Sequence, residues 1–172
     1  EKGANPSQLN SNSFDPVVMA INAGAPDETV KYLLTLPGHA ITKKTHDGRI
    51  YIHWAANRGN IALVEYLIKK GSPVSILDSH GATPVTFAAA AGQVDTKLYD
   101  IFAANGVNLK TDVNSSGANA LLLAIAADKD LKLTDYFIAK GISLDSKDAQ
   151  GNNAFAYAAR GGNVEVLKAL VK

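Results

Sequence analysis

Residues 81–92, which read GATPVTFAAAAG, decide the fold of this chain. Glycine and proline are the strongest breakers of regular structure, yet Gly81 and Pro84 stand just before Phe87 and four consecutive alanines. Alanine is the best helix former. Proline suits the first position of a helix because its missing N–H would have no partner there, and Gly92 ends the run. The stretch therefore predicts a turn followed by a helix of barely two turns.

The same turn and short helix recur along the chain. Gly48, Gly81, Gly117 and Gly151 each open a similar block at intervals of 33 to 36 residues, and residues 14–24 fit the same frame. One column of the alignment always holds a large residue with an apolar body: Met19, Trp54, Phe87, Leu123 and Tyr157. The next column always holds alanine: Ala20, Ala55, Ala88, Ala124 and Ala158. Such a period indicates stacked structural repeats, with one packing layer that occurs five times.

A second periodic segment follows each block. Residues 60–71, NIALVEYLIKKG, place apolar residues at helical spacing and end on Gly71, as expected for a left-handed C-terminal cap. A short extended piece comes next, with one aliphatic residue that we expect to be buried: Ile41, Val74, Leu109 or Leu144. Each unit therefore reads as a turn, a short helix, a longer helix and an extended loop.

This unit resembles the ankyrin repeat, which has a period of about 33 residues and the signature Thr-Pro-Leu-His-x-Ala. The best local matches are residues 81–92 and residues 52–71, IHWAANRGNIALVEYLIKKG. The resemblance implies an all-α solenoid of five ankyrin repeats, each a β-turn plus an antiparallel helix pair. We predict a polar N-terminal extension and one repeat domain with these bounds: extension 1–13, domain 14–172, and repeats near 14–44, 45–77, 78–113, 114–147 and 148–172.

The units also depart from the ankyrin pattern. The Thr-Pro pair is intact only at Thr83 and Pro84, and the histidine position holds histidine only at His53. In the family these residues tie the turn to the helix by hydrogen bonds. We expect most of these ties to be missing here, and the array to be less stable than a consensus one. The first and third units carry extra residues, which we expect to lengthen the outer helix or its loop.

Composition excludes several classes of protein. The chain has 172 residues, of which 47% are hydrophobic, with a net charge of +1 and no basic cluster longer than a pair. Nucleic-acid binding usually needs a basic stripe, and a membrane span needs about 20 apolar residues, so we expect neither. Cysteine is absent, which excludes a disulfide framework, a thiolate metal site and a cysteine nucleophile.

No catalytic or cofactor-binding motif is present. The four histidines are His39, His46, His53 and His80, and none stands in an HExxH pattern. His53 occupies the structural histidine position of the repeat, and Trp54 belongs to the large packing column. His46 and His80 lie at turn tips a full repeat apart, so a zinc site between them is not expected. We predict no catalytic residue, no metal and no cofactor.

In ankyrin proteins, turn tips and the exposed side of the short helix contact a protein partner on the concave face. Transferring this by position predicts the following contact residues: His46, Asp47, Arg49, Asn57, Arg58, Ser79, His80, Ala82, Ala90, Ala91, Ser115, Ser116, Ala118, Ala126, Ala127, Ala149, Gln150, Asn152 and Arg160. Tyr51 is added because the family has proline there, and we expect this ring to reach the surface. We expect the three arginines to hold acidic or carbonyl groups of the partner, since arginine forms forked hydrogen bonds.

The expected function is a non-catalytic module, monomeric alone, that binds a folded protein and inhibits or masks it. The chain is similar to small bacterial envelope ankyrin proteins that protect a cell from its own wall-degrading enzymes, which implies a periplasmic or secreted location. Its first residue is Glu1 and its start is polar, like a mature exported chain. The alternatives are a cytosolic adaptor that links two proteins and, third, an enzyme or ligand-binding protein.

Overall fold

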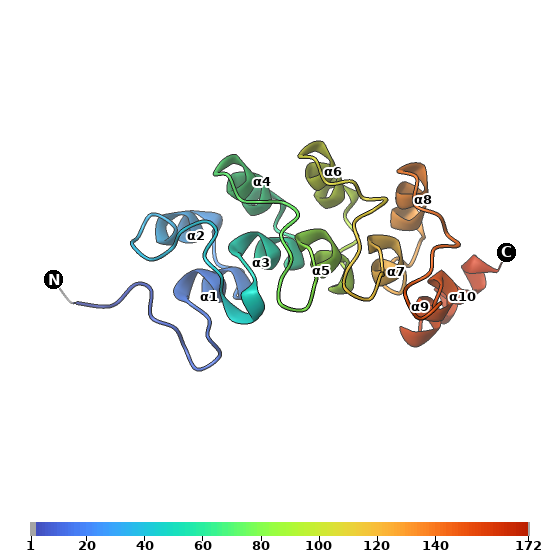
Figure 1. Cartoon of the computed structure of the whole chain (residues 1–172), viewed down its shortest axis with the longest axis horizontal. Coiled ribbons are helices and arrows are strands. Elements are labelled where there is room, and N and C mark those ends of the chain that lie inside the picture. Colours follow the sequence, from blue (N-terminus) through green and yellow to red (C-terminus); the bar gives the residue numbers. More distant parts are fainter. Residues whose placement is uncertain (1–2, 172) are drawn as a thin grey trace.

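The computed structural model describes residues 3–171, so the first two residues of the expected extension and the last residue of the fifth repeat lie outside it. This part of the chain folds into ten α-helices in five consecutive pairs (Figure 1). The pairs are α1 (Pro16–Asn22) with α2 (Asp27–Leu33), α3 (Tyr51–Asn57) with α4 (Ile61–Lys69), α5 (Pro84–Ala90) with α6 (Thr96–Ala104), α7 (Ala120–Ala124) with α8 (Lys132–Ala139), and α9 (Ala154–Arg160) with α10 (Val164–Leu170). The expected all-helical solenoid is confirmed.

The first helices of the pairs stack in one row and the second helices of the first four pairs in another (Figure 1). Contacts link α1 to α3, α3 to α5, α5 to α7 and α7 to α9. Ala55, Ala88, Ala124 and Ala158 are buried between these helices. Small side chains at these positions let neighbouring helices approach closely, as expected. No helix within residues 3–171 has both the length and the apolar character needed to cross a bilayer.

The helix starts are tied to their turns more completely than the altered Thr-Pro positions suggested. Asp15, Thr83, Asn119 and Asn153 each cap an inner helix, accepting a hydrogen bond from the backbone N–H three residues on. In α3, where Ile50 has no such side chain, His53 Nδ1 instead accepts from the Ile50 N–H at 3.3 Å. The expectation that most ties are lost is wrong, because aspartate and asparagine cap as well as threonine does.

The extra residues of the third unit lie in a loop. Helices α4 and α6 are both 9 residues long, and the insertion falls before Asp95, which caps α6. In the first unit α2 has only 7 residues and ends at Leu33, five residues before Gly38. Two expected core positions are also wrong: Met19 of the large column and Leu144 are both exposed, and Ile142 is buried near Leu144.

Residues of the N-terminal extension contact the first repeat. The Pro6 carbonyl oxygen lies 2.8 Å from Nε2 of the buried His39. A Cβ atom on Gly38 would lie 2.8 Å from the Ser7 Cβ, and the Gly38 φ of +87° is one that only glycine adopts readily. The extension is therefore seated on the loop that follows α2.

Candidate functional site

Four tight turns precede the inner helices α3, α5, α7 and α9, and we call residues 46–49, 79–82, 115–118 and 149–152 the turn-tip row. Neighbouring tips are hydrogen-bonded to each other. The Ser79 N–H donates to the Asp47 carbonyl (2.8 Å), the Ser115 hydroxyl to the His80 carbonyl (2.7 Å), and the Ala149 N–H to the Ser116 carbonyl (2.9 Å). Ser79, Ser115 and Ala149 were predicted as partner contacts, but these polar groups already hold the tips in register.

Two glycines allow the tips to approach this closely. A Cβ on Gly48 would lie 2.7 Å from the Ser79 hydroxyl oxygen, and one on Gly81 would lie 2.6 Å from the Ser115 Cβ. Both glycines have positive φ, +70° and +72°. The repeating glycine is therefore required by the turn and also by the next tip.

Arg49 is engaged inside the protein. Its Nε donates to Asp78 Oδ2 at 2.9 Å and its Nη1 to Asp47 Oδ2 at 3.0 Å. The guanidinium carbon lies 4.2 Å from the centre of the Phe87 ring and 5.2 Å from that of Trp54. Trp54 is buried and donates to the Thr45 hydroxyl, so its predicted core role is confirmed. Arg49 therefore serves the structure of the second and third repeats, and its fork is not free for a partner.

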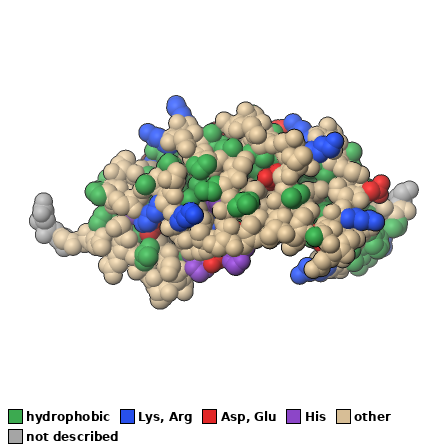
Figure 2. All heavy atoms as spheres, in the orientation of Figure 1, with side chains coloured by type: hydrophobic (Ala, Val, Ile, Leu, Met, Phe, Trp, Pro, Cys, Tyr) green, Lys and Arg blue, Asp and Glu red, His purple; other side chains and the backbone are tan. Residues whose placement is uncertain are grey.

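His46 and His80 meet around the carboxylate of Asp47. Their Nε2 atoms lie 3.3 Å and 3.2 Å from Asp47 Oδ2, which Arg49 also contacts. Figure 2 shows histidine side chains flanking an acidic one at the lower edge of the molecule. Burial by itself would raise the pKa of Asp47, but the hydrogen bond from His80 and the neighbouring charges of His46, Arg49 and His80 outweigh it, so this pKa is lowered.

His46 and His80 are a full repeat apart in the sequence, but stacking places one tip directly beside the next, so this separation does not keep the two side chains apart in space. No group of three or more histidine, cysteine, aspartate or glutamate residues within residues 3–171 has an arrangement that could hold a metal ion. At the Asp47 carboxylate, Arg49 contacts the oxygen that both histidine rings approach.

Tyr51 is not at the surface, and the prediction that it contacts a partner is wrong. Its side chain is fully buried and its hydroxyl donates to Asp15 Oδ2 at 2.7 Å, with His39 Nδ1 at 3.2 Å. Ala118 is also fully buried, so the prediction that it contacts a partner is wrong too. His53 is buried with its Nε2 3.3 Å from the Ala82 carbonyl, which confirms its structural role.

The middle of the predicted surface exposes small apolar side chains. Ala90, Ala91 and Ala127 are exposed, and Ala126 is partly exposed. Ala126 packs closely against the fifth repeat, since a Cβ atom added to Gly161 would clash with the Cβ of Ala126. Ala90 and Ala91 lie at the end of α5, and Ala127 lies three residues after the end of α7. We call these three residues the alanine surface.

The second repeat contributes less free polar surface than predicted. The Arg58 guanidinium donates to the Asn22 carbonyl of the first repeat. The Asn57 carbonyl accepts from the Gln93 side-chain amide at 2.7 Å, and the Asn57 amide donates to the Phe87 carbonyl at 3.5 Å. These groups tie consecutive inner helices together, so a sequence list of polar residues overestimates what is available to a partner.

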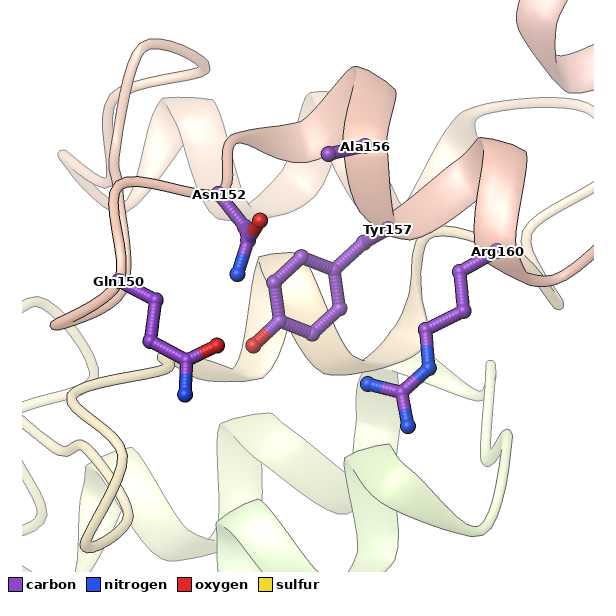
Figure 3. Close-up of a pocket in the computed structure, with 5 residues that line it drawn as sticks. All are labelled: Gln150, Asn152, Ala156, Tyr157 and Arg160. Atoms are coloured by element: carbon purple, nitrogen blue, oxygen red, sulfur yellow. The ribbon is translucent and has the colours of Figure 1, made fainter.

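The fifth repeat holds an open cleft of about 310 Å³ on this surface (Figure 3). It is lined by Gln150, Asn152, Ala156, Tyr157 and Arg160. Three of these were predicted as contact residues. Ala156 and Tyr157 were missed, and the signal for Tyr157 was available: among the large residues of its column it is the one with a phenolic hydroxyl.

Asp148 organises one wall of this cleft. Its carboxylate accepts from the backbone N–H groups of Gln150 and Asn152, from the Asn152 amide and from the Tyr157 hydroxyl, all at 2.9 Å. The Asn152 side-chain bond is the largest cause that lowers the pKa of Asp148 to about 2. The Asp148 carboxylate is therefore ionised at neutral pH and engaged by four donors.

Comparison with known proteins agrees with the geometry. A family model described as three copies of the ankyrin repeat matches residues 17–99, and a second one, described as many copies, matches residues 121–171. Similar curated proteins include a putative ankyrin repeat protein, L271, of Acanthamoeba polyphaga mimivirus (27% identical, 57% of this chain, 14% of the relative). Two others are human ankyrin repeat domain-containing proteins: number 63 (29% identical, 64% of this chain, 30% of the relative) and number 29 (40%, 33% and 19%).

The chain spans less than a third of the length of each of these relatives. The names of these relatives mention the ankyrin repeat but no partner. The relatives therefore support the fold and the general mode of action. Five stacked helix pairs, glycine turn tips and the two family matches agree. The chain belongs to the ankyrin-repeat proteins, a family of protein–protein interaction modules.

Proposed function

We propose that this chain binds one folded protein across the turn-tip row and the alanine surface, acts as a monomer, and masks the part of the partner that it covers. The observation that supports this most is the alanine surface itself. Ala90, Ala91 and Ala127 are exposed at or just beyond the C-terminal ends of the inner helices α5 and α7, and such small side chains let a protruding partner element approach the backbone. Side chains with few rotamers also lose little conformational entropy when they are covered.

The test blocks the alanine surface without touching the core. Ala90→Arg places a long cation at the last residue of α5, and Ala104→Arg makes the same change at the last, exposed residue of the outer helix α6. We expect Ala90→Arg to weaken capture of the partner at least about tenfold, because a bulky charge would hold the surfaces apart. Ala104→Arg should bind like the parent.

The partner is first captured on the immobilised chain, identified by mass spectrometry, and its affinity is then measured by calorimetry. Thermal unfolding checks that both variants fold. If folded Ala90→Arg binds as tightly as the parent, the partner does not use this surface and the proposal fails.

A finer proposal concerns the kind of partner. We propose a peptidoglycan-degrading enzyme of the periplasm, masked by the chain so that the producing cell is protected. The absence of cysteine suits an oxidising compartment, and the resemblance to small envelope ankyrin proteins supports the role. Adding the chain to periplasmic extract should reduce hydrolysis of purified peptidoglycan. Capture of only cytosolic proteins would instead favour an adaptor.

A further inference from the structure

The three arginines of the chain differ in whether their guanidinium is already used. Arg49 pairs with Asp78 and Asp47, and Arg58 donates to the Asn22 carbonyl. Arg160, the last residue of α9, is exposed and makes no ion pair or side-chain hydrogen bond within residues 3–171. A guanidinium carries five donors and stays charged at every relevant pH, so Arg160 is the arginine with its full binding capacity available.

Arg160 faces a cleft whose own carboxylate does not compete for it. In Figure 3 the Gln150 and Arg160 side chains lie on opposite sides of the Tyr157 ring. The carboxylate of Asp148 is engaged by four donors from its turn and from Tyr157. Within the described chain the Gln150 side-chain amide has no hydrogen-bond partner. The cleft therefore offers one cation and one neutral amide donor.

The preceding repeat explains why Asp148 has no arginine partner. Asp148 stands three residues before Gly151, as Asp78 stands three before Gly81. In the earlier case the preceding tip supplies Arg49, one residue after Gly48. In the later case the residue one after Gly117 is the buried Ala118, which cannot pair.

We propose that the cleft of the fifth repeat is a subsite for one carboxylate, carried by an aspartate or glutamate side chain on the protein partner, and this rests on the proposed function. A single guanidinium fork matches one carboxylate in geometry and charge. A phosphate, with a charge approaching −2, would keep an uncompensated negative charge near Asp148. The Gln150 amide adds a donor that a carboxylate oxygen can accept.

The test uses a small carboxylate in place of the unidentified partner. The full chain, labelled with ¹⁵N, is titrated with N-acetylglutamate methylamide while the Nε–H signal of Arg160 is followed by NMR. The neutral N-acetylglutamine methylamide serves as the control at equal ionic strength. We expect a saturable shift with the glutamate compound and at least about fivefold weaker binding of the glutamine compound.

Three variants test the assignment to Arg160. Arg160→Gln should abolish the saturable response of the Gln150 and Asn152 side-chain amides, whereas Arg58→Gln should leave it unchanged. Arg160→Lys should weaken binding without abolishing it, since the charge remains and the fork is lost. The subsite is rejected if the response does not saturate, if both compounds act equally, or if the Arg58 and Arg160 signals respond alike.

Failure of the subsite and failure of the proposed function give different results. A chain that binds the glutamate compound, yet whose Ala90→Arg variant captures its partner unchanged, keeps the subsite and loses the proposed surface. A chain that is blocked by Ala90→Arg but does not bind the compound keeps the surface and loses the subsite.

Discussion

The tip of the third repeat and the cleft of the fifth repeat contain the same kinds of groups but differ in which of them are free. In both, an aspartate turn residue uses Oδ1 to accept two backbone N–H groups of its own turn. Oδ2 of Asp78 then accepts from Arg49, whereas Oδ2 of Asp148 accepts from Tyr157 and Asn152. A neighbouring repeat therefore decides whether a charged residue supports the array or remains available for binding.

The largest effect should come from Asp15, which joins the first two repeats. Its buried carboxylate accepts from Lys43 Nζ (2.7 Å), the Tyr51 hydroxyl (2.7 Å) and the Val18 N–H (3.0 Å). We expect Asp15→Ala to lower the free energy of unfolding by about 3 kcal/mol, because it removes a helix cap and leaves buried donors unpaired. Urea unfolding followed by circular dichroism measures the loss.

The matched control is Asn153→Ala in the fifth repeat, which removes an exposed cap from α9. Only a cap is lost there, so we expect about 1 kcal/mol. Equal losses for the two variants would contradict the view that Asp15 contributes a buried polar network in addition to its helix cap.

Replacing Arg49 should destabilise the protein more than replacing Arg160. Arg49→Ala leaves the buried Asp78 carboxylate without its charged partner and removes packing on Phe87, so we expect a loss of about 2 kcal/mol in the free energy of unfolding. Arg160→Ala should stay within about 0.5 kcal/mol of the parent, as an exposed residue without partners does. Thermal unfolding of both variants in one buffer makes the comparison. A destabilised Arg160→Ala would show that this side chain supports the fold.

The smallest effects on stability should come from changes of pH, to which Asp15 and Asp112 should respond in opposite directions. Burial by itself raises the pKa of Asp15, but hydrogen bonds from Lys43, Tyr51 and Val18 outweigh it and lower this pKa. The stability that Asp15 contributes is therefore present above its ordinary pKa of 3.8 and is lost as pH falls through the lowered value. Burial raises the pKa of Asp112 despite the hydrogen bond from Thr83, so its contribution is present at low pH and is lost as pH rises through the raised value.

Urea unfolding of Asp112→Asn and the parent between pH 3 and pH 7, the range about the ordinary aspartate pKa, checks this sign. The variant should lose less stability than the parent as the pH rises, because a neutral amide carries no desolvation penalty for ionisation. An identical pH profile for the two proteins would mean that the Asp112 environment does not disfavour its charge.

Local sequence signals predicted the architecture well. The recurring glycines, the large column and the alanine column each report a short-range requirement: a turn with positive φ, a packed ring, or a close helix contact. These requirements repeat with every unit, so five weak signals reinforced one another. The capping groups were misjudged because asparagine and aspartate at the threonine position were counted as losses, although they accept the same N–H.

The contact residues were harder to predict for a physical reason. Position within a repeat says that Tyr51 and Ala118 lie near the tip, but their burial depends on what the neighbouring units place against them. Tyr51 is buried because Asp15 and His39 of the first repeat provide hydrogen-bond partners. Many contacts between repeats join residues about 29 to 37 positions apart, such as Arg49 with Asp78 and Asn163 with Ala126, and no local window contains both partners.

The repeat and the helix pairs could be predicted from the sequence by itself, because they follow from patterns that each unit carries within itself. The side of the solenoid on which a partner is expected came from the resemblance to ankyrin proteins. Three features became visible only in the folded structure. His46 and His80 approach one carboxylate, and Arg49 forms an ion pair with Asp78. Arg160 has no such partner and lines an open cleft. Stacking brings distant residues into contact one repeat apart. The free or paired state of a charge is a property of that contact and not of the residue.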